Sequence, residues 1–144
     1  MMGFPDRIER SIELPHPPAK VWAALTTAEG LSGWFGDQAT IDLRPGGPAR
    51  MTFRSGLTVD MRIERVEEPA VFGFTWRIPG LPGDDPRRTY VEFTLEEVRS
   101  GTRLRVVETG FAQLPEDSRH ATYDSHTAGW VSELGDLAGY LDAR

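Results

Sequence analysis

Three histidines are the side chains of this sequence best suited to exchange protons or bind metal near neutral pH. They are His16, His120 and His126. On a helix, the last two would point about 120° apart, so they cannot share a metal ion from one helix face. No cluster of cysteine, aspartate or glutamate completes a ligand set around them. We therefore expect neither a metal site nor a cofactor.

The run from Asp124 to His126 has the residue types of a catalytic triad. A triad needs its nucleophile, imidazole and carboxylate joined by hydrogen bonds. Adjacent helical residues point about 100° apart, so these three side chains cannot form that relay. The chain has no cysteine, which excludes disulfides, thiolate metal sites and cysteine nucleophiles. We identify no catalytic residue from these motifs, and binding is a better hypothesis than catalysis.

Two charged residues interrupt apolar faces of predicted strands. Arg10 lies between Ile8 and Ile12, and Glu108 follows Val106 at the same spacing of two. Burying an unpaired charge is strongly unfavourable, so a buried Arg10 or Glu108 requires a partner. The alternative is that the strand ends splay apart and both charges reach solvent.

The elements that position these residues follow from the hydrophobic periodicity. Alternation with a period of two predicts a strand at residues 7–14 and six more strands between Gln38 and Thr109. Two short helices lie between the first strand and this meander. A capping box formed by Thr26 and Glu29 is expected to open the second helix. The segment from Pro79 to Pro86 is rich in proline and glycine and predicts an irregular loop.

The C-terminal third of the chain changes to a helical period. Its apolar positions predict one stripe on a helix of about six turns. A lone helix can bury such a stripe only against the sheet, and the sheet must curve to meet it. The stripe consists of Tyr123, Trp130, Leu134, Leu137 and Leu141.

Length and charge limit the function further. The 144 residues suit one domain, which we expect to span residues 1–144. A net charge of -6 argues against binding to nucleic acid or to anionic membranes. No apolar segment has the character of a signal peptide or the length of a membrane span, so we expect a cytoplasmic protein.

Five segments in a fixed order carry a family resemblance. They are VWAALTTAEGLSGWFG (21–36), IDLRPGG (41–47), VFGFTW (71–76), SGTRLRVVETGF (100–111) and HTAGWVSELGDLAGYL (126–141). Together they resemble the START/Bet v 1-like (SRPBCC) superfamily, most closely its bacterial members related to the C-terminal domain of the HSP-90 ATPase activator. The resemblance spans about Arg7 to Leu141. It implies an α+β helix-grip fold, in which a curved seven-stranded antiparallel sheet wraps around a long C-terminal helix and two short helices follow the first strand.

In such folds a cavity separates the sheet from the last helix, and aromatic side chains either fill the core or line that cavity. Trp76 and Trp130 are the strongest pair, because one is predicted on the sheet and the other on the helix that faces it. His126 is interpreted either as a structural histidine or as a side chain that faces the cavity. The predicted ligand contacts are Trp34, Phe35, Met61, Trp76, Phe93, Tyr123, His126 and Trp130.

The same resemblance makes the first and last strands antiparallel neighbours. Arg10 and Glu108 are then within reach of each other, and we predict that they pair or form a polar rim that orients a ligand. The leading hypothesis is binding of a small, mostly apolar molecule. The alternatives are an enzyme of the polyketide cyclase or hydratase type and a co-chaperone-like interaction module, with a protein partner or a second copy of the chain.

Overall fold

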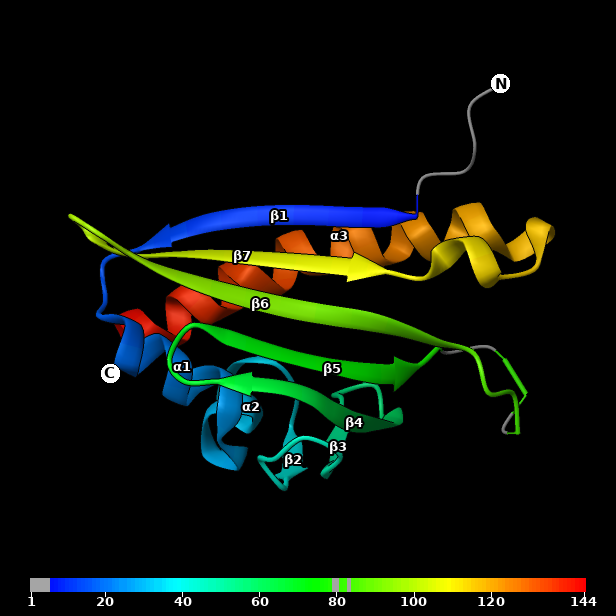
Figure 1. The fold of residues 1–144 in the computed structure, drawn as a ribbon, viewed down its shortest axis with the longest axis horizontal. Coiled ribbons are helices and arrows are strands. Elements are labelled where there is room, and N and C mark those ends of the chain that lie inside the picture. Colours follow the sequence, from blue (N-terminus) through cyan, green and yellow to red (C-terminus); the bar gives the residue numbers. More distant parts are fainter. Residues whose placement is uncertain (1–5, 79–80, 83) are drawn as a thin grey trace.

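A seven-stranded antiparallel sheet and a long C-terminal helix form the frame of the protein (Figure 1). The structure is a computed structural model that describes residues 6–78, 81–82 and 84–144. Pro79, Gly80 and Gly83 of the predicted loop therefore lie outside the described residues. The elements are β1 (Arg7–Leu14), α1 (Pro18–Thr26), α2 (Ala28–Trp34), β2 (Gln38–Ile41), β3 (Pro48–Thr52), β4 (Thr58–Glu67), β5 (Val71–Arg77), β6 (Arg88–Val98), β7 (Gly101–Thr109), the 3-10 helix η1 (Phe111–Gln113) and α3 (Glu116–Asp142).

The strand order is β1-β7-β6-β5-β4-β3-β2, so the first and last strands are neighbours and the sheet is not closed. In β1 and β7, Arg7 lies opposite Thr109 and Leu14 opposite Thr102. The predicted α+β helix-grip fold is confirmed, including the two short helices that follow β1.

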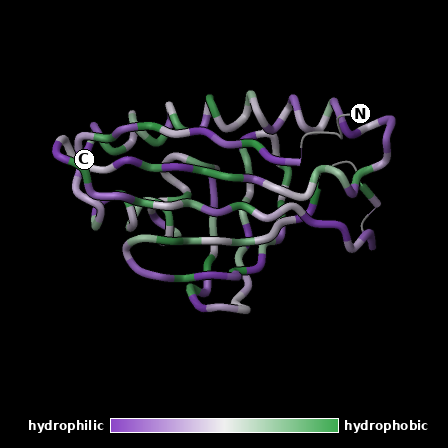
Figure 2. The backbone as a smooth tube through the Cα atoms, turned by 45° about the horizontal axis from the view of Figure 1, so that its top comes forward, coloured by the Kyte–Doolittle hydropathy of each residue, from purple (hydrophilic) through white to green (hydrophobic). Residues whose placement is uncertain are grey.

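Alternation along the strands buries one face of the sheet against the helices. In β4, Val59, Met61 and Ile63 are buried and the residues between them are exposed. Figure 2 shows the same alternation as hydrophobic and hydrophilic segments that follow one another along the strands. This period of two is what places large apolar side chains on the inner face.

The helices cover that inner face. Trp130, Leu134, Leu137 and Leu141 of α3 are buried, as the predicted stripe requires. Tyr123 is only partly buried, and its hydroxyl donates a hydrogen bond to the carbonyl oxygen of Arg7 at 3.0 Å. Burial therefore increases along the stripe from Tyr123 to Trp130, because the later turns of α3 pack more deeply into the core.

The start of α2 corrects one expectation. Its N-cap is Thr27, whose hydroxyl accepts a hydrogen bond from the backbone N–H of Gly30 at 2.9 Å. Thr26 instead belongs to α1 and donates to the carbonyl oxygen of Trp22 at 2.8 Å. The expected capping box of Thr26 and Glu29 was therefore wrong: Thr27 is the cap, and the third residue after it is Gly30, which has no side chain to complete a box.

Candidate ligand-binding site

A buried carboxylate organises the centre of the inner face. Glu108 of β7 is 0% exposed, yet four side chains donate hydrogen bonds to it. The Oε2 atom accepts from Trp76 Nε1 at 3.0 Å and from the Thr89 hydroxyl at 2.6 Å. The Oε1 atom accepts from Trp130 Nε1 at 2.8 Å and from His126 Nδ1 at 2.9 Å. We call these five residues the Glu108 network; they come from β5, β6, β7 and α3.

The network keeps this carboxylate ionised. Burial by itself raises the pKa of Glu108, but the hydrogen bond and charge of His126 lower it, and the hydrogen bonds from Thr89 and Trp130 lower it further. The net effect is a pKa below the usual value. A carboxylate has about four acceptor positions, so four donors saturate it. Four donors, one of which carries a positive charge when His126 is protonated, therefore allow the carboxylate to be fully buried with no lysine or arginine among its hydrogen-bond donors.

The expected pair of Arg10 and Glu108 is not formed, and that prediction was wrong. Arg10 lies opposite Val106, whereas Glu108 lies opposite Ile8. The Arg10 side chain is exposed and donates to the carbonyl oxygen of Glu9 at 2.7 Å. Because β1 is an edge strand, a long side chain on it can turn to water instead of crossing to Glu108.

Aromatic rings fill the space in which a cavity was expected. The rings of Phe35, Trp76 and Trp130 lie 5.8 to 5.9 Å apart, with interplanar angles of 21° to 25°. Trp34 stacks on Phe35 at 4.8 Å, and Phe53 meets Phe35 edge-on at 5.5 Å. The two tryptophans of the sheet and the helix are therefore in contact, and these rings occupy the space between β5 and α3.

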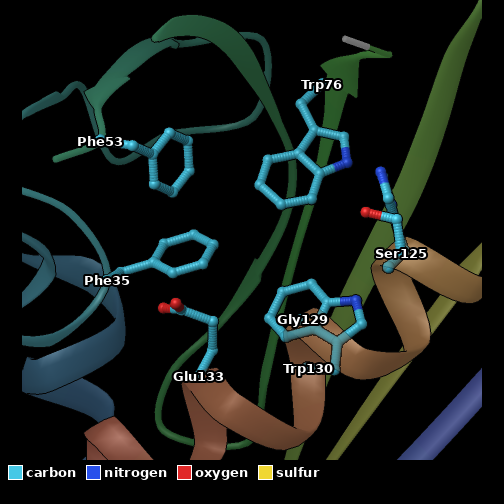
Figure 3. Close-up of a pocket in the computed structure, with 8 residues that line it drawn as sticks. Phe35, Phe53, Trp76, Ser125, Gly129, Trp130 and Glu133 are labelled. Carbon is cyan, nitrogen blue, oxygen red and sulfur yellow. The ribbon is translucent and has the colours of Figure 1, made fainter. Parts of the chain in front are cut away.

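The open space lies at the edge of this ring cluster. One pocket of about 180 Å³ opens between α2, the β3–β4 hairpin, β5 and α3 (Figure 3). We call it the aromatic pocket. It is lined by Phe35, Phe53, Trp76, Ser125, His126, Gly129, Trp130 and Glu133.

A second pocket of about 230 Å³ adjoins the first. The two share Phe53, Trp76 and His126. The second pocket adds Leu57 and Val59, which extend the apolar wall along the hairpin side, and Arg77 of β5. His126 and Trp76 thus stand at the junction of the two spaces.

The predicted ligand contacts divide between this pocket and the core. Phe35, Trp76, His126 and Trp130 line the aromatic pocket. The others lie elsewhere: Met61 and Phe93 are buried in the core, Trp34 donates from Nε1 to the carbonyl oxygen of Ala24, and Tyr123 packs edge-on against Phe111 at 5.4 Å.

The predicted ligand contacts missed four lining residues: Phe53, Ser125, Gly129 and Glu133. Phe53 continues the alternation that includes Met51, so its aromatic side chain on the inner face was a usable signal. Glu133 follows His126 by seven residues, and this spacing places both on nearly the same face of a helix. A carboxyl at that spacing, between the apolar positions 130 and 134, could have identified it.

Glu133 is a partly buried carboxyl group at the end of the aromatic pocket. Its side chain points toward Phe35 (Figure 3). Burial and, to a smaller extent, the charge of Asp136 raise the pKa of Glu133, the charge of Arg54 lowers it, and the net value is about 7. Its Oε2 atom has no hydrogen-bond partner among the described residues. The pocket wall therefore includes a carboxyl oxygen whose hydrogen-bonding capacity is unused within the described residues.

Metal ligands and membrane helices are both missing from the part of the chain that the structure describes. No three His, Cys, Asp or Glu side chains there are grouped so that they could hold a metal ion. None of the helices there combines the length and the apolar character required to cross a membrane.

Solved structures share this fold over nearly the whole chain. Protein MLL2253 from Mesorhizobium loti is 27% identical, with a TM-score of 0.81 over 95% of this chain and 97% of that one. DynU16, a protein in the dynemicin biosynthetic locus, is 25% identical, with a TM-score of 0.80 over 96% of this chain. This chain spans only 48% of DynU16.

The Aha1 dimer from Colwellia psychrerythraea is 21% identical and has a TM-score of 0.75, over 94% of this chain and 95% of that one. No curated protein matches this chain. The family model described as "Activator of Hsp90 ATPase homolog 1-like protein" matches residues 15–142. The START/Bet v 1-like resemblance is thereby confirmed, and this chain belongs to the family of Activator of Hsp90 ATPase homolog 1-like proteins.

Proposed function

We propose that this protein binds a flat, mostly apolar small molecule in the aromatic pocket. The observation that supports this most is the ring arrangement: Phe35, Trp76 and Trp130 are nearly parallel and border an open pocket, and Phe53 stands edge-on beside them. Aromatic rings prefer offset-stacked or edge-to-face neighbours, so a planar ligand gains contacts on both kinds of surface here.

The dimensions limit the size of that molecule. Pockets for drug-sized ligands have volumes of about 300–1,000 Å³. The aromatic pocket and the second pocket measure about 180 and 230 Å³, so each alone suits one or two fused rings. A longer ligand would have to pass from one pocket into the other beside Trp76 and His126.

Polar groups at the pocket wall would orient such a ligand. A binding site typically combines an apolar lining with a few polar groups that fix orientation. His126 and Glu133 are those groups here, and the buried Oε2 atom of Glu133 has no partner among the described residues that a ligand donor would have to displace. The similarity to DynU16, which belongs to a biosynthetic locus, also favours a small-molecule ligand over a protein ligand.

The interaction-module alternative has less support. Leu57 and Val131, 45% and 59% exposed, are the large apolar side chains that stand out into solvent among the described residues. Two such side chains do not make the extended apolar patch expected of a protein docking surface.

The second candidate function is instead an enzyme of the cyclase type, favoured by one observation: the hydrogen bond between Glu108 and His126 beside the pocket.

A binding titration tests the proposal. Naphthalene-type compounds added to the protein should quench or shift the emission of Trp76 and Trp130 and should raise the melting temperature. Phe53→Ala should weaken binding roughly tenfold, because it removes one wall of the pocket. Val66→Ala is the matched control, since this partly buried side chain lies far along β4 from the pocket and should leave affinity unchanged. Absence of binding, or equal losses in both variants, would overturn the proposal.

A further inference from the structure

One nitrogen of the His126 ring is held inside the protein and the other is available to a ligand. Nδ1 lies 2.9 and 3.0 Å from the two carboxylate oxygens of Glu108. No hydrogen bond to Nε2 is formed within the described residues. The side chain is 15% exposed and lines both the aromatic pocket and the second pocket.

The chemistry of Glu108 decides which nitrogen carries the proton. An ionised carboxylate can only accept hydrogen bonds, and Glu108 is ionised because its donors lower its pKa. Nδ1 of His126 must therefore be the N–H donor. In the neutral imidazole the lone pair is then on Nε2, which makes that atom a hydrogen-bond and proton acceptor.

The ring is also fixed in orientation. It packs edge-on against Trp76 at 6.2 Å and against Phe111 at 5.4 Å, with interplanar angles of 80° and 88°. Glu108 itself is fixed by donors from β5, β6 and α3. A side chain held in this way needs no rearrangement to accept a hydrogen bond, which favours specific recognition.

We propose that His126 is the acceptor group of the aromatic pocket, and that the ligand is a flat phenol or enol whose hydroxyl donates to Nε2. This inference rests on the proposed function, since it names the class of molecule bound at the same site. A planar ring stacks along Trp76 and Trp130, and its hydroxyl reaches the junction of the two pockets where His126 stands.

The same contact allows complete proton transfer. The O–H bond of the ligand breaks, its electron pair stays on the oxygen, and the proton bonds to the lone pair of Nε2. The products are a phenolate or enolate and an imidazolium ion, whose charge the Glu108 carboxylate balances at 2.9 Å. No other reactant is required. Glu108 acts in this step only as a positioning residue, because all its acceptor positions are occupied.

The test compares β-naphthol with β-methylnaphthalene, two ligands of equal size that differ in the hydroxyl. Affinities for the original protein and for His126→Phe are measured by calorimetry. The ratio of naphthol to methylnaphthalene affinity should be about three- to tenfold higher in the original protein than in the variant, as one hydrogen bond predicts. If the phenylalanine form does not fold, His126→Gln replaces it and the readout is the proton transfer described next: its amide N–H can still donate to Glu108, whereas its amide oxygen can accept a hydrogen bond but is too weak a base to take the proton.

A second readout reports the proton itself. A naphthol becomes a much stronger acid when excited, and its anion emits at longer wavelength than the neutral form. With excitation beyond tryptophan absorption, bound β-naphthol should show more anion emission in the original protein than in the His126 variant.

The outcomes separate the two proposals. If both ligands bind but the affinity ratio and the anion emission are unchanged by the variant, the role of His126 is overturned and the binding function stands. If neither ligand binds, the proposed function fails, and the inference that rests on it fails with it.

Discussion

Two glutamates on the inner side of this protein have opposite electrostatic behaviour. Glu108 is completely buried, and its pKa is lowered. Glu133 is less buried, and its pKa is raised to about 7. Burial alone would give Glu108 the higher pKa of the two, because burial disfavours the charged form of a carboxyl group. The number of hydrogen-bond donors explains the difference: four side chains donate to Glu108, whereas the Oε2 atom of Glu133 has no partner within the described residues.

The comparison also separates two roles. A saturated carboxylate holds other side chains in place and has no capacity left for a ligand. An unsaturated carboxyl beside an apolar pocket is costly to ionise, but it can bind a donor from outside. The Glu108 network is therefore the rigid part of the site, and Glu133 is its adaptable part.

The largest effect is expected from Glu108→Ala. It leaves four buried donors without their acceptor, so the free energy of unfolding should fall by about 3–5 kcal/mol. Urea unfolding at neutral pH measures this change. Glu97→Ala is the control, since that glutamate is exposed on β6 and its loss should cost less than about 0.5 kcal/mol. A loss below about 1 kcal/mol for Glu108→Ala would mean that the donors find other partners.

The next effect concerns the charge of the acceptor. Trp130 Nε1 donates to the Glu108 carboxylate at 2.8 Å, and Trp34 Nε1 donates to the neutral carbonyl of Ala24 at the same distance. Trp130→Phe should therefore be more destabilising than Trp34→Phe by about 1 kcal/mol, because hydrogen bonds to charged groups are stronger. Both variants lose the same part of the ring and both sites are buried, so the matched pair isolates the acceptor. Equal losses in urea unfolding would contradict this account.

A smaller effect is expected from Glu133→Gln. Because the folded pKa of Glu133 is raised, its contribution to stability is fully present below the unfolded pKa and is lost as the pH rises through about 7. The variant removes this loss, so its melting temperature should exceed that of the original protein by roughly 1–2 °C at about pH 8. The difference should vanish toward about pH 4, where the carboxyl is protonated in both states. A melting temperature of Glu133→Gln below that of the original protein at about pH 8 would contradict this account.

The smallest effect is the coupling between Arg10 and Glu108. The structure points Arg10 to solvent and gives Glu108 other partners, so the two should contribute independently. A double-mutant cycle with Arg10→Ala and Glu108→Gln should give a coupling energy within about 0.5 kcal/mol of zero. A larger coupling would show that Arg10 still contributes to the charge balance of the network.

The order of elements could be predicted from the sequence because it depends on local period. Alternation in β4 and the stripe of α3 each decide which face of one element is apolar, and neither needs a distant partner. The family segments added the helix-grip arrangement and the neighbouring positions of β1 and β7, both of which the structure contains. Trp76 and Trp130 were recognised for the same reason, as large side chains on the sheet and on the helix that faces it, whereas Phe35 was included only as an aromatic residue that follows the second short helix.

The partners of those side chains depended on the tertiary structure. The register of β1 on β7 places Ile8, and not Arg10, opposite Glu108, and no pattern within either strand specifies this. The donors to Glu108 lie on β5, β6 and α3, far apart in the sequence, and they meet only when the helix packs across the sheet. Packing also decided that the rings of Trp76 and Trp130 touch, which leaves the open pocket at the edge of the cluster. Periodicity determines the face on which a side chain lies, whereas its contacts depend on how the elements pack together.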